Sequence, residues 1–401
     1  MKTVIFAGFV VAAGIFAGAH FSRAVQGTDF PQFYCAARML GEGSGRELYD
    51  LAVQEQYQAR YAGRAGTPYT HPPFEAAAYG VVAWLPLRQG YILWFLLNLG
   101  FVAMAAQRLA RDAPGWLGNW RLLFAASLMF VPVLLCLQQA QDSVLLLMLA
   151  ILALEMLKRG RGFSAGCWLG LALFKFQIAL PLALVLVLEA GAEQRGRLAR
   201  GFACVGLVLA AVSAFLCGWR VFIEYPRFVI GFGSQPYAGM HPEAMANFRG
   251  LTSLMLGREY STWGMIMVCG LSFAALLWTV SVGRRAIGRA GAGVIPAREF
   301  DSVFCSAVLF ALLASYHLNP HDLSLALLPM FLMLKQSCPW AGGGRNWLLA
   351  IGIAALLVPA LGVWALRTGV YGLMVIPVTG LFLLGVTGSS ESRADSKPRH
   401  L

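Results

Sequence analysis

The residue best suited to catalyse a reaction follows the first apolar run of the chain. Asp29 stands among aromatic residues, in the sequence Thr-Asp-Phe-Pro-Gln-Phe-Tyr. A carboxylate at the edge of a membrane could act as a general base that removes a proton from an acceptor hydroxyl. The residues alone leave a second interpretation open, because an acid just before Pro31 could simply cap a helix.

Further polar residues recur at the ends of apolar runs, where cations and amides could stabilise a phosphate leaving group. Lys175 needs a partner or must reach the lipid headgroups, because a cation between two apolar helices is costly. Asp142 could instead cap the following helix, as Asp50 could at another helix start. The candidate residues of this kind are Gln141, Asp142, Lys175, Gln177, Arg249, His317, His321 and Asp322.

His317, His321 and Asp322 also invite interpretation as a metal site. Asn319-Pro320 breaks any helix face that the two histidines could share, and no cysteine or further acid completes a ligand set. The chain has no Walker sequence and no Gly-x-Ser-x-Gly in a suitable context. We therefore expect no metal, no other cofactor and no soluble nucleotide chemistry.

The composition places these residues in a membrane protein. The chain has 401 residues, of which 58% are hydrophobic and 12% charged, which is too apolar for an ordinary soluble protein. A net charge of +12 could indicate nucleic acid, but Lys and Arg fall in short clusters between apolar runs. Such clusters are typical of membrane topology signals, so we expect no nucleic-acid partner. The eight cysteines include no Cys-x-x-Cys and are expected to be packing residues.

We predict an all-α polytopic membrane protein with about twelve transmembrane helices. The expected helices lie at roughly 3–21, 90–107, 121–137, 143–157, 163–175, 177–190, 201–218, 262–282, 300–316, 322–334, 347–366 and 370–387. They form a single integral-membrane domain, 1–388, followed by a polar cytoplasmic tail, 389–401.

The basic clusters fix the expected topology. The apolar stretch 72–86 is short and bounded by prolines, so we predict a helix in the outer interface rather than a span. The clusters at 108–121, 158–161 and 195–200 then share the cytoplasmic side. The same rule splits 163–190 into two short helices with Lys175 at the outer turn.

Two long loops, 22–89 and 219–261, face outward in this topology. In the first, we predict interfacial helices that begin near Pro31 and at Asp50. The second shows no clear periodicity. Because the polar candidates also lie at outer helix ends, they converge on one face of the membrane, where the protein is expected to act.

The motifs, taken together, resemble glycosyltransferase family 87, the polyprenyl-phosphate-mannose-dependent mannosyltransferase-like enzymes of GT-C architecture. The first outer loop carries the resemblance in Asp29-Phe30, Phe33-Tyr34, Ala37-Arg38, Leu48-Tyr49-Asp50, Tyr69 and Pro72-Pro73-Phe74. Later stretches match in order, namely Ala140-Gln141-Asp142-Ser143, Lys175-Phe176-Gln177, Asn247-Phe248-Arg249-Gly250-Leu251 and Asn319-Pro320-His321-Asp322.

The resemblance implies a GT-C-type fold and the inverting transfer of a sugar, most often mannose. The donor would be a polyprenyl-phosphate sugar and the acceptor a glycan or glycolipid, on the extracytoplasmic side of the cell membrane. The family's base falls on Asp29, and the family generally shows no metal dependence. With it we predict donor-phosphate contacts from Lys175, Gln177, Arg249 and His321. Cavity or acceptor contacts are predicted from Tyr34, Arg38, His71, Gln141, Asp142, His317 and Asp322.

Two positions depart from the family pattern, and one rival function stays open. Many relatives have Gly where this chain has Ala140, and Pro where it has Phe176. The rival is a polytopic lipid or solute transporter, or flippase, without glycosyl transfer. Transporters tend to carry mid-membrane sites in related halves, whereas this chain shows no evident repeat and gathers its polar groups at outer ends. The oligomeric state stays open.

Overall fold

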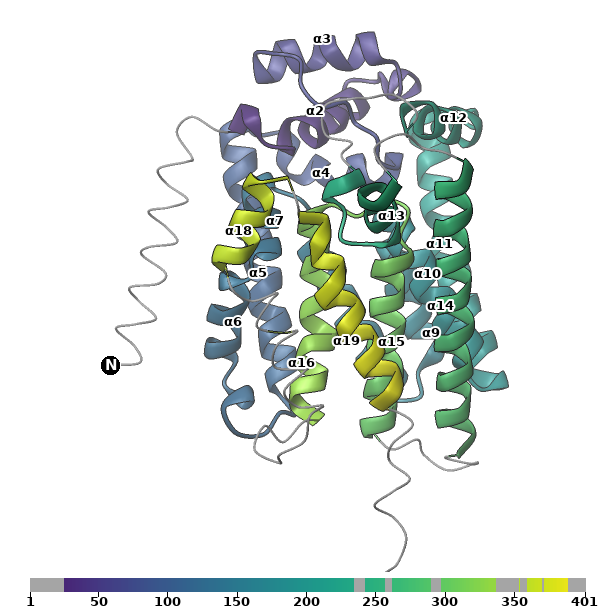
Figure 1. Ribbon diagram of the computed structural model, residues 1–401. Coiled ribbons are helices and arrows are strands. Elements are labelled where there is room, and N and C mark those ends of the chain that lie inside the picture. The colour runs from purple at the N-terminus through teal and green to yellow at the C-terminus, as the bar shows by residue number, and fades with distance from the viewer. Residues whose placement is uncertain are drawn as a thin grey trace, which may run out of the picture.

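The computed structural model describes residues 25–233, 242–256, 262–289, 297–336, 353, 359–369 and 371–388. The predicted helix 3–21, most of the predicted helix 347–366 and the tail 389–401 lie outside the described residues. Within the described ranges every element is a helix and none is a strand (Figure 1). The predicted all-α class is therefore confirmed for this part of the chain.

Four helical segments are long and apolar enough to cross a membrane. They are α5 (Leu87–Ala110), the segment Gly162–Glu189, α11 (Ala192–Cys217) and residues Thr262–Arg285 of α14 (Thr262–Arg289). A fifth results if α6 (Trp120–Met129) and α7 (Val131–Gln139) count together, although they are bent by 76°. Pro132 near the start of α7 explains the bend, because proline cannot donate the backbone hydrogen bond that continues a helix. The predicted count of about twelve spans is not confirmed.

The remaining elements are shorter. The α-helices are α2 (Phe30–Gly41), α3 (Leu51–Ala62), α4 (Pro73–Ala83), α8 (Ser143–Lys158), α9 (Gly162–Leu171), α10 (Phe176–Glu189), α12 (Val221–Gly233), α13 (Phe248–Leu256), α15 (Ala297–Ala314), α16 (Leu327–Gln336), α18 (Pro359–Arg367) and α19 (Val375–Gly388). The 3-10 helices are η1 (Val25–Gly27), η2 (Gly45–Glu47), η3 (Gly115–Gly118), η4 (Ala172–Lys175), η5 (Pro242–Ala244), η6 (Pro320–Ala326) and η7 (Tyr371–Met374).

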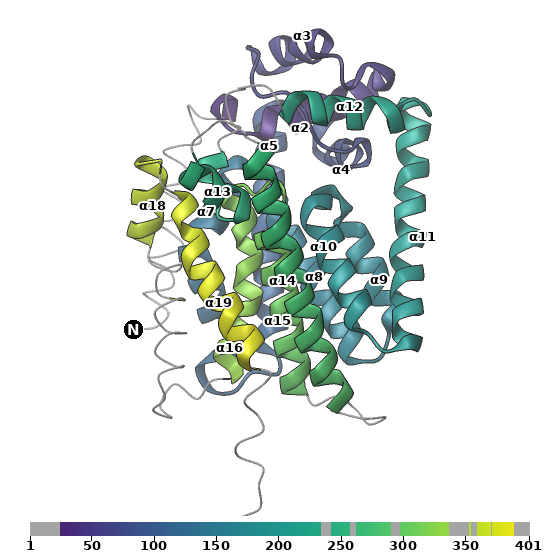
Figure 2. The ribbon, with the colours of Figure 1, turned by 45° about the vertical axis from the view of Figure 1, so that its right-hand side comes forward.

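Helices α2, α3 and α4 form a layer across one end of the bundle (Figures 1 and 2). Pro31 stands in the first turn of α2, and Asp50 caps α3 by accepting hydrogen bonds from the amides of Ala52 and Val53. Both predicted helix starts are therefore confirmed. Helix α4 packs against α2 through stacked rings of Phe33 and Tyr79, 4.5 Å apart, and is too short to span a membrane.

The second long loop contains helices that the sequence analysis missed. Helix α12 lies in the same end layer (Figure 2), and α13 follows it. The residues Val221, Tyr225 and Phe228 have the spacing of three and four that a helix requires, and Tyr225 packs on Tyr49 with ring centroids 5.1 Å apart. Pro226 interrupts this pattern in the sequence, yet α12 continues through it. The prediction of an aperiodic second loop is wrong for these residues.

Glycines bring α9 and α11 into direct backbone contact. A Cβ atom on Gly166 would lie 2.1 Å from the carbonyl oxygen of Leu198, and one on Gly201 would lie 2.0 Å from that of Phe163. Small residues at regular intervals allow membrane helices to approach this closely. Gly162 also faces Gln194, so residue numbers rise together along both helices and they run parallel.

Helix α10 returns toward the end from which α9 starts. At its last turn the carbonyl of Leu188 accepts a hydrogen bond from Arg284 Nε (2.9 Å), and α11 begins soon after. The segment 162–189 is therefore a helical hairpin, although its length alone would allow one span. Lys175 ends η4 at the tip, which confirms the predicted split into two short helices with Lys175 at the turn.

The basic clusters gather at the opposite end of the bundle from α2–α4. Arg108, at the end of α5, binds Glu155 near the end of α8 (2.9 Å). Lys158 forms an ion pair with Asp301 near the start of α15. The helix ends whose clusters predict a cytoplasmic location thus meet in space, as the topology required.

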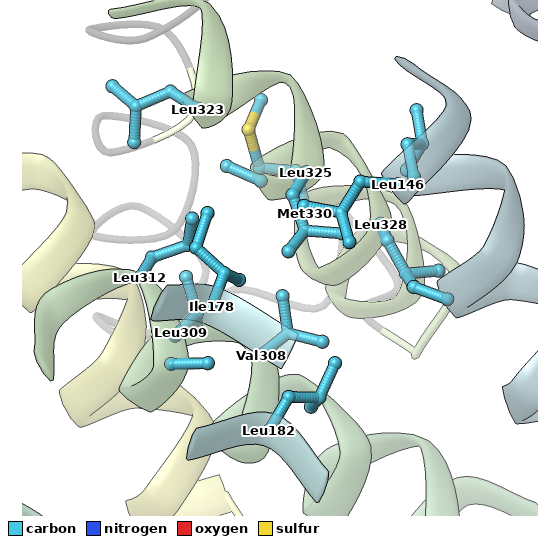
Figure 3. Close-up of a cluster of buried hydrophobic side chains, with 14 of the residues drawn as sticks. Leu146, Ile178, Leu182, Val308, Leu309, Leu312, Leu323, Leu325, Leu328 and Met330 are labelled. Atoms are coloured by element: carbon cyan, nitrogen blue, oxygen red, sulfur yellow. The ribbon is translucent and has the colours of Figure 1, made fainter. Parts of the chain in front are cut away.

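One apolar core joins α8, α10, α15, η6 and α16. Figure 3 shows ten labelled members, all buried: Leu146, Ile178, Leu182, Val308, Leu309, Leu312, Leu323, Leu325, Leu328 and Met330. Dense packing of this kind resists displacement of one helix against another. The ends of α8, η4–α10 and η6 that carry the polar candidate residues are therefore rigidly placed.

Candidate active site

Lys175 lies at the centre of a buried polar cluster at the tip of the α9–α10 hairpin. Its Nζ is 3.1 Å from Gln141 Oε1, 3.4 Å from Asp142 Oδ1 and 3.5 Å from Asp322 Oδ1. The side chain is 2% exposed, so it does not extend to the headgroups. Two acids and an amide thus satisfy the buried ammonium group.

Asp322 joins this cluster to α8. Its Oδ1 accepts a hydrogen bond from Ser143 Oγ (2.7 Å), and its Oδ2 accepts one from the backbone amide of Asn319 (2.9 Å). A carboxylate with several donors stays ionised even when buried. Asp322 is therefore a fixed negative charge that pairs with Lys175.

Asp29 is linked to Lys175 through a single residue. Gln141 Nε2 donates to Asp29 Oδ2 (2.7 Å), and the backbone amide of Asp29 donates to Gln139 Oε1 (2.9 Å). The Asp29 side chain makes no capping hydrogen bond to α2, and that of Asp142 makes none to α8. Within the described residues, Asp29 Oδ1 accepts no hydrogen bond. The carboxylate therefore has one oxygen occupied and one available.

The turn between α7 and α8 presents Gln141 through a left-handed backbone. Ala140 has φ 52° and ψ 39°, a conformation that glycine adopts most readily. The left-handed conformation is thus consistent with the glycine that the family resemblance places at this position. Two hydrogen bonds hold the turn, from Tyr79 Oη to the Ala140 carbonyl (3.1 Å) and from Asn98 Nδ2 to the Gln141 carbonyl (2.8 Å).

Asp142 interacts with a second buried acid, Glu75, on α4. The two carboxyl groups lie close enough to alter each other's ionisation. Burial raises the pKa of Glu75 to about 8, so Glu75 is protonated at neutral pH. His71 Nδ1 lies 3.0 Å from Glu75 Oε2 and completes the arrangement. Sequence reasoning missed Glu75, whose only signal is an isolated acid in an apolar helix.

Burial also sets the protonation of Asp29 and His71. It raises the pKa of Asp29, while the hydrogen bond from Gln141 and the charge of Lys175 oppose the rise. Burial lowers the pKa of His71 to about 4, so this imidazole is neutral at neutral pH. A carboxylate with a raised pKa and a free oxygen has the properties of a general base.

A second group of donors lies around Tyr316. Arg249, from α13, stacks on the Tyr316 ring with its Cζ 4.1 Å from the centroid, and its Nη1 donates to the Tyr316 carbonyl (3.1 Å). His321 Nε2 is 3.6 Å from Asp322 Oδ1. Buried ring nitrogens of His317 and His321 have no hydrogen-bond partner among the described residues.

In the part of the chain described, no hydrogen bond or ion pair joins the Lys175 cluster to the predicted site residues Tyr34, Arg38 and Gln177. The hydroxyl of Tyr34 donates to the Leu85 carbonyl (2.7 Å), and Arg38 donates to that hydroxyl (3.1 Å). Both side chains hold the first loop together. Gln177 lies half-buried on α10, two residues beyond Lys175.

The family model of glycosyltransferase family 87 matches residues 69–315, more than half of the chain. None of the curated proteins and none of the solved structures matches the chain. The matched segment contains the α7–α8 turn, Lys175 and Arg249, whereas Asp29 precedes it and Asp322 follows it. Together with the apolar helices described above, this match leads to one conclusion: the chain belongs to glycosyltransferase family 87 and is a membrane glycosyltransferase.

Proposed function

We propose that the enzyme transfers a sugar from a polyprenyl-phosphate donor to a glycan or glycolipid acceptor with inversion, and that this sugar is mannose. One observation carries the proposal: the Asp29 carboxylate has one oxygen bound to Gln141, while the other accepts no hydrogen bond from any described residue. The polar cluster lies at the end of the bundle opposite the basic clusters. Because Lys and Arg favour the cytoplasmic side, this arrangement supports an extracytoplasmic site.

In the proposed reaction, Asp29 Oδ1 accepts the proton of the acceptor hydroxyl while the hydroxyl oxygen bonds to the anomeric carbon. On the opposite face the bond from that carbon to the phosphate oxygen breaks, and polyprenyl phosphate leaves with the electron pair. Displacement from the face opposite the leaving group inverts the anomeric centre. The raised pKa of Asp29 suits a base, because a proton acceptor works best when its pKa approaches the working pH.

Donors for the departing phosphate are proposed on Arg249 and His321. A guanidinium presents several N–H groups to phosphate, and a neutral imidazole can donate one hydrogen bond. Stacking on Tyr316 holds the Arg249 side chain in one orientation. Phosphate at this position would lie beside the two histidines whose ring nitrogens have no partner among the described residues.

The test measures transfer by the purified protein in nanodiscs, supplied with radiolabelled polyprenyl-phosphate mannose and a lipid extract of its native membrane as the acceptor source. We expect labelled glycosidic product from the natural protein. Asp29→Asn and Asp29→Ala should insert and fold normally but lose transfer by about 100-fold or more, the usual scale of general-base catalysis.

Asp50→Asn is the matched control, because Asp50 is an acid of the same loop that only caps α3. It should retain transfer. Near-normal turnover by Asp29→Asn would refute the base assignment. Movement of the labelled lipid across the bilayer without glycosidic product would instead support the flippase alternative.

A further inference from the structure

We propose that Gln141 and Lys175 are positioning residues for Asp29 and that neither contacts the donor phosphate. The inference rests on the proposed function, because it takes Asp29 as the base. It replaces the expectation from the family resemblance that Lys175 lies against the lipid phosphate.

The two partners of the Gln141 side chain determine the orientation of its amide. A glutamine side chain has a donor end and an acceptor end, whereas a lysine ammonium can only donate. Gln141 Oε1 must therefore face Lys175 (3.1 Å), which directs Nε2 to Asp29 Oδ2 (2.7 Å). A reversed amide would set two donors against each other and an oxygen against a carboxylate. Lys175 thus determines which end of Gln141 meets Asp29.

Lys175 is already surrounded by side chains of opposite charge. Its ammonium group donates a hydrogen bond to Gln141 Oε1 and forms ion pairs with Asp142 and Asp322. The side chain is almost completely buried among them. A phosphate oxygen at Lys175 would add a further anion to this buried site, where the carboxylates of Asp142 and Asp322 already lie beside the ammonium group.

Hydrogen bonds also hold the turn between α7 and α8 rigid. The backbone of Gln141 is held at both polar atoms, since its amide donates to the Cys136 carbonyl (2.9 Å) and its carbonyl accepts from Asn98 Nδ2 (2.8 Å). Gln139, from the same turn, accepts the backbone amide of Asp29. The turn therefore fixes both the main chain and the side chain of Asp29, which leaves Oδ1 in a constant direction.

The hydrogen bond has a measurable electrostatic effect. The titratable or charged groups that act on Asp29 are His71 before α4, Lys175 on η4 and Asp322 on η6. Donation by Gln141 favours the ionised carboxylate, so loss of the amide raises the pKa of Asp29. Because only ionised Asp29 can accept a proton, the acidic limb of the pH–rate profile then moves to higher pH.

The experiment compares the natural protein with Gln141→Met, Gln141→Glu and Gln138→Met. Met keeps the length of Gln without its hydrogen bonds. Glu keeps an acceptor for Lys175, which favours folding, but places a like charge beside Asp29. Gln138→Met is the matched control, because the Gln138 side chain forms no hydrogen bond to the cluster among the described residues. The readouts are kcat/KM for transfer against pH and the Kd for polyprenyl-phosphate mannose.

For both Gln141 variants, we expect the acidic limb of the pH–rate profile to move to higher pH by about one unit or more. This shift corresponds to the loss of one hydrogen bond to a charged group. Transfer should fall about tenfold or more on the acidic side and less on the alkaline side. The Kd for the donor should stay within about twofold, below one hydrogen bond's effect. Gln138→Met should leave both readouts unchanged.

An acidic limb that stays at the same pH in Gln141→Met or Gln141→Glu would overturn the inference. If the Kd for the donor also increased, Gln141 would instead be a ligand of the substrate. The two proposals fail separately. If Asp29→Asn is inactive while the limb of the Gln141 variants stays in place, the positioning role is wrong and the base assignment stands. If Asp29→Asn is active, the proposed function itself is wrong.

Discussion

At the scale of single residues, the polar cluster combines fixed charges with one acid that retains a proton. Asp322 is stabilised as an anion by Ser143, Asn319 and Lys175. Glu75 has no such set of donors, so burial keeps it protonated. The site thereby limits its own negative charge, which would favour binding of the phosphate donor proposed above.

We predict that Glu75→Gln changes the pH dependence of stability. The pKa of Glu75 is 4.5 ordinarily and about 8 in the folded protein. Below the lower value both states are protonated. Between the two pKa values of Glu75 only the unfolded state ionises, so the free energy of unfolding of the natural protein falls as pH rises to about 8. Glutamine does not ionise, so Glu75→Gln avoids this loss of stability, which is on the order of a few kcal/mol. The melting temperature of Glu75→Gln should therefore rise relative to that of the natural protein as pH increases.

Thermal unfolding in nanodiscs across this pH window, followed by intrinsic tryptophan fluorescence, checks the prediction. Glu47→Gln provides the control, because Glu47 is exposed on η2 and its replacement should leave the pH dependence unchanged. A difference between Glu75→Gln and the natural protein that stays constant with pH would contradict the retained proton.

Members of the cluster could be predicted only where the local sequence places a polar residue at the end of an apolar helix. Asp29, Gln141, Lys175 and Asp322 stand at helix ends, and a shared membrane face brings such ends together. Glu75 could not be found in this way, because its complete burial arises only from tertiary packing. The orientation of the Gln141 amide likewise depends on Lys175, which no local pattern indicates.

At the scale of elements, the α9–α10 hairpin depends on how closely α9 approaches α11. Its helix boundaries follow from sequence, since Lys175 interrupts the apolar run and basic clusters flank it. The close approach follows from glycines whose contacts only the structure shows. Helix α12 was missed because Pro226 interrupts its periodicity, although the packing of Tyr225 on Tyr49 maintains the helix.

We predict that Gly201→Ala destabilises the protein and displaces Lys175. The added Cβ would lie 2.0 Å from the Phe163 carbonyl oxygen, so α9 and α11 must separate. Overpacking of this kind costs about 1–3 kcal/mol. The melting temperature should fall, and transfer should fall with it because α9 supports the lysine.

Gly196→Ala is the matched control in the same helix, because nothing lies within 4 Å of its added Cβ. Alanine is the better helix former by about 1 kcal/mol, so this variant should melt at the same or a higher temperature. Equal melting temperatures for Gly201→Ala and the natural protein would show that the two helices can separate without cost.

At the scale of the whole molecule, the chain divides its charged residues between two ends. The acids that surround Lys175 and the described histidines lie beneath α2–α4, and the clustered arginines and lysines lie at the far end of α5, α8 and α10. The apolar core between them excludes water from the middle of the bundle. The layer of α2, α3 and α4 covers the polar cluster at this end, so the orientation of the bundle decides which side of the membrane the cluster faces.

We predict that the α3 end of the bundle faces away from the cytoplasm, because clustered Lys and Arg remain on the cytoplasmic side. In a cysteine-free background, Glu55→Cys on α3 and Arg111→Cys at the end of α5 place one exposed thiol at each end. A membrane-impermeant maleimide should label Glu55→Cys in intact spheroplasts, but Arg111→Cys only after permeabilisation. The reverse pattern would put Asp29 on the cytoplasmic side, where the acceptor would have to be a cytoplasmic molecule, and labelling of both thiols in intact spheroplasts would show that the chain inserts in two orientations.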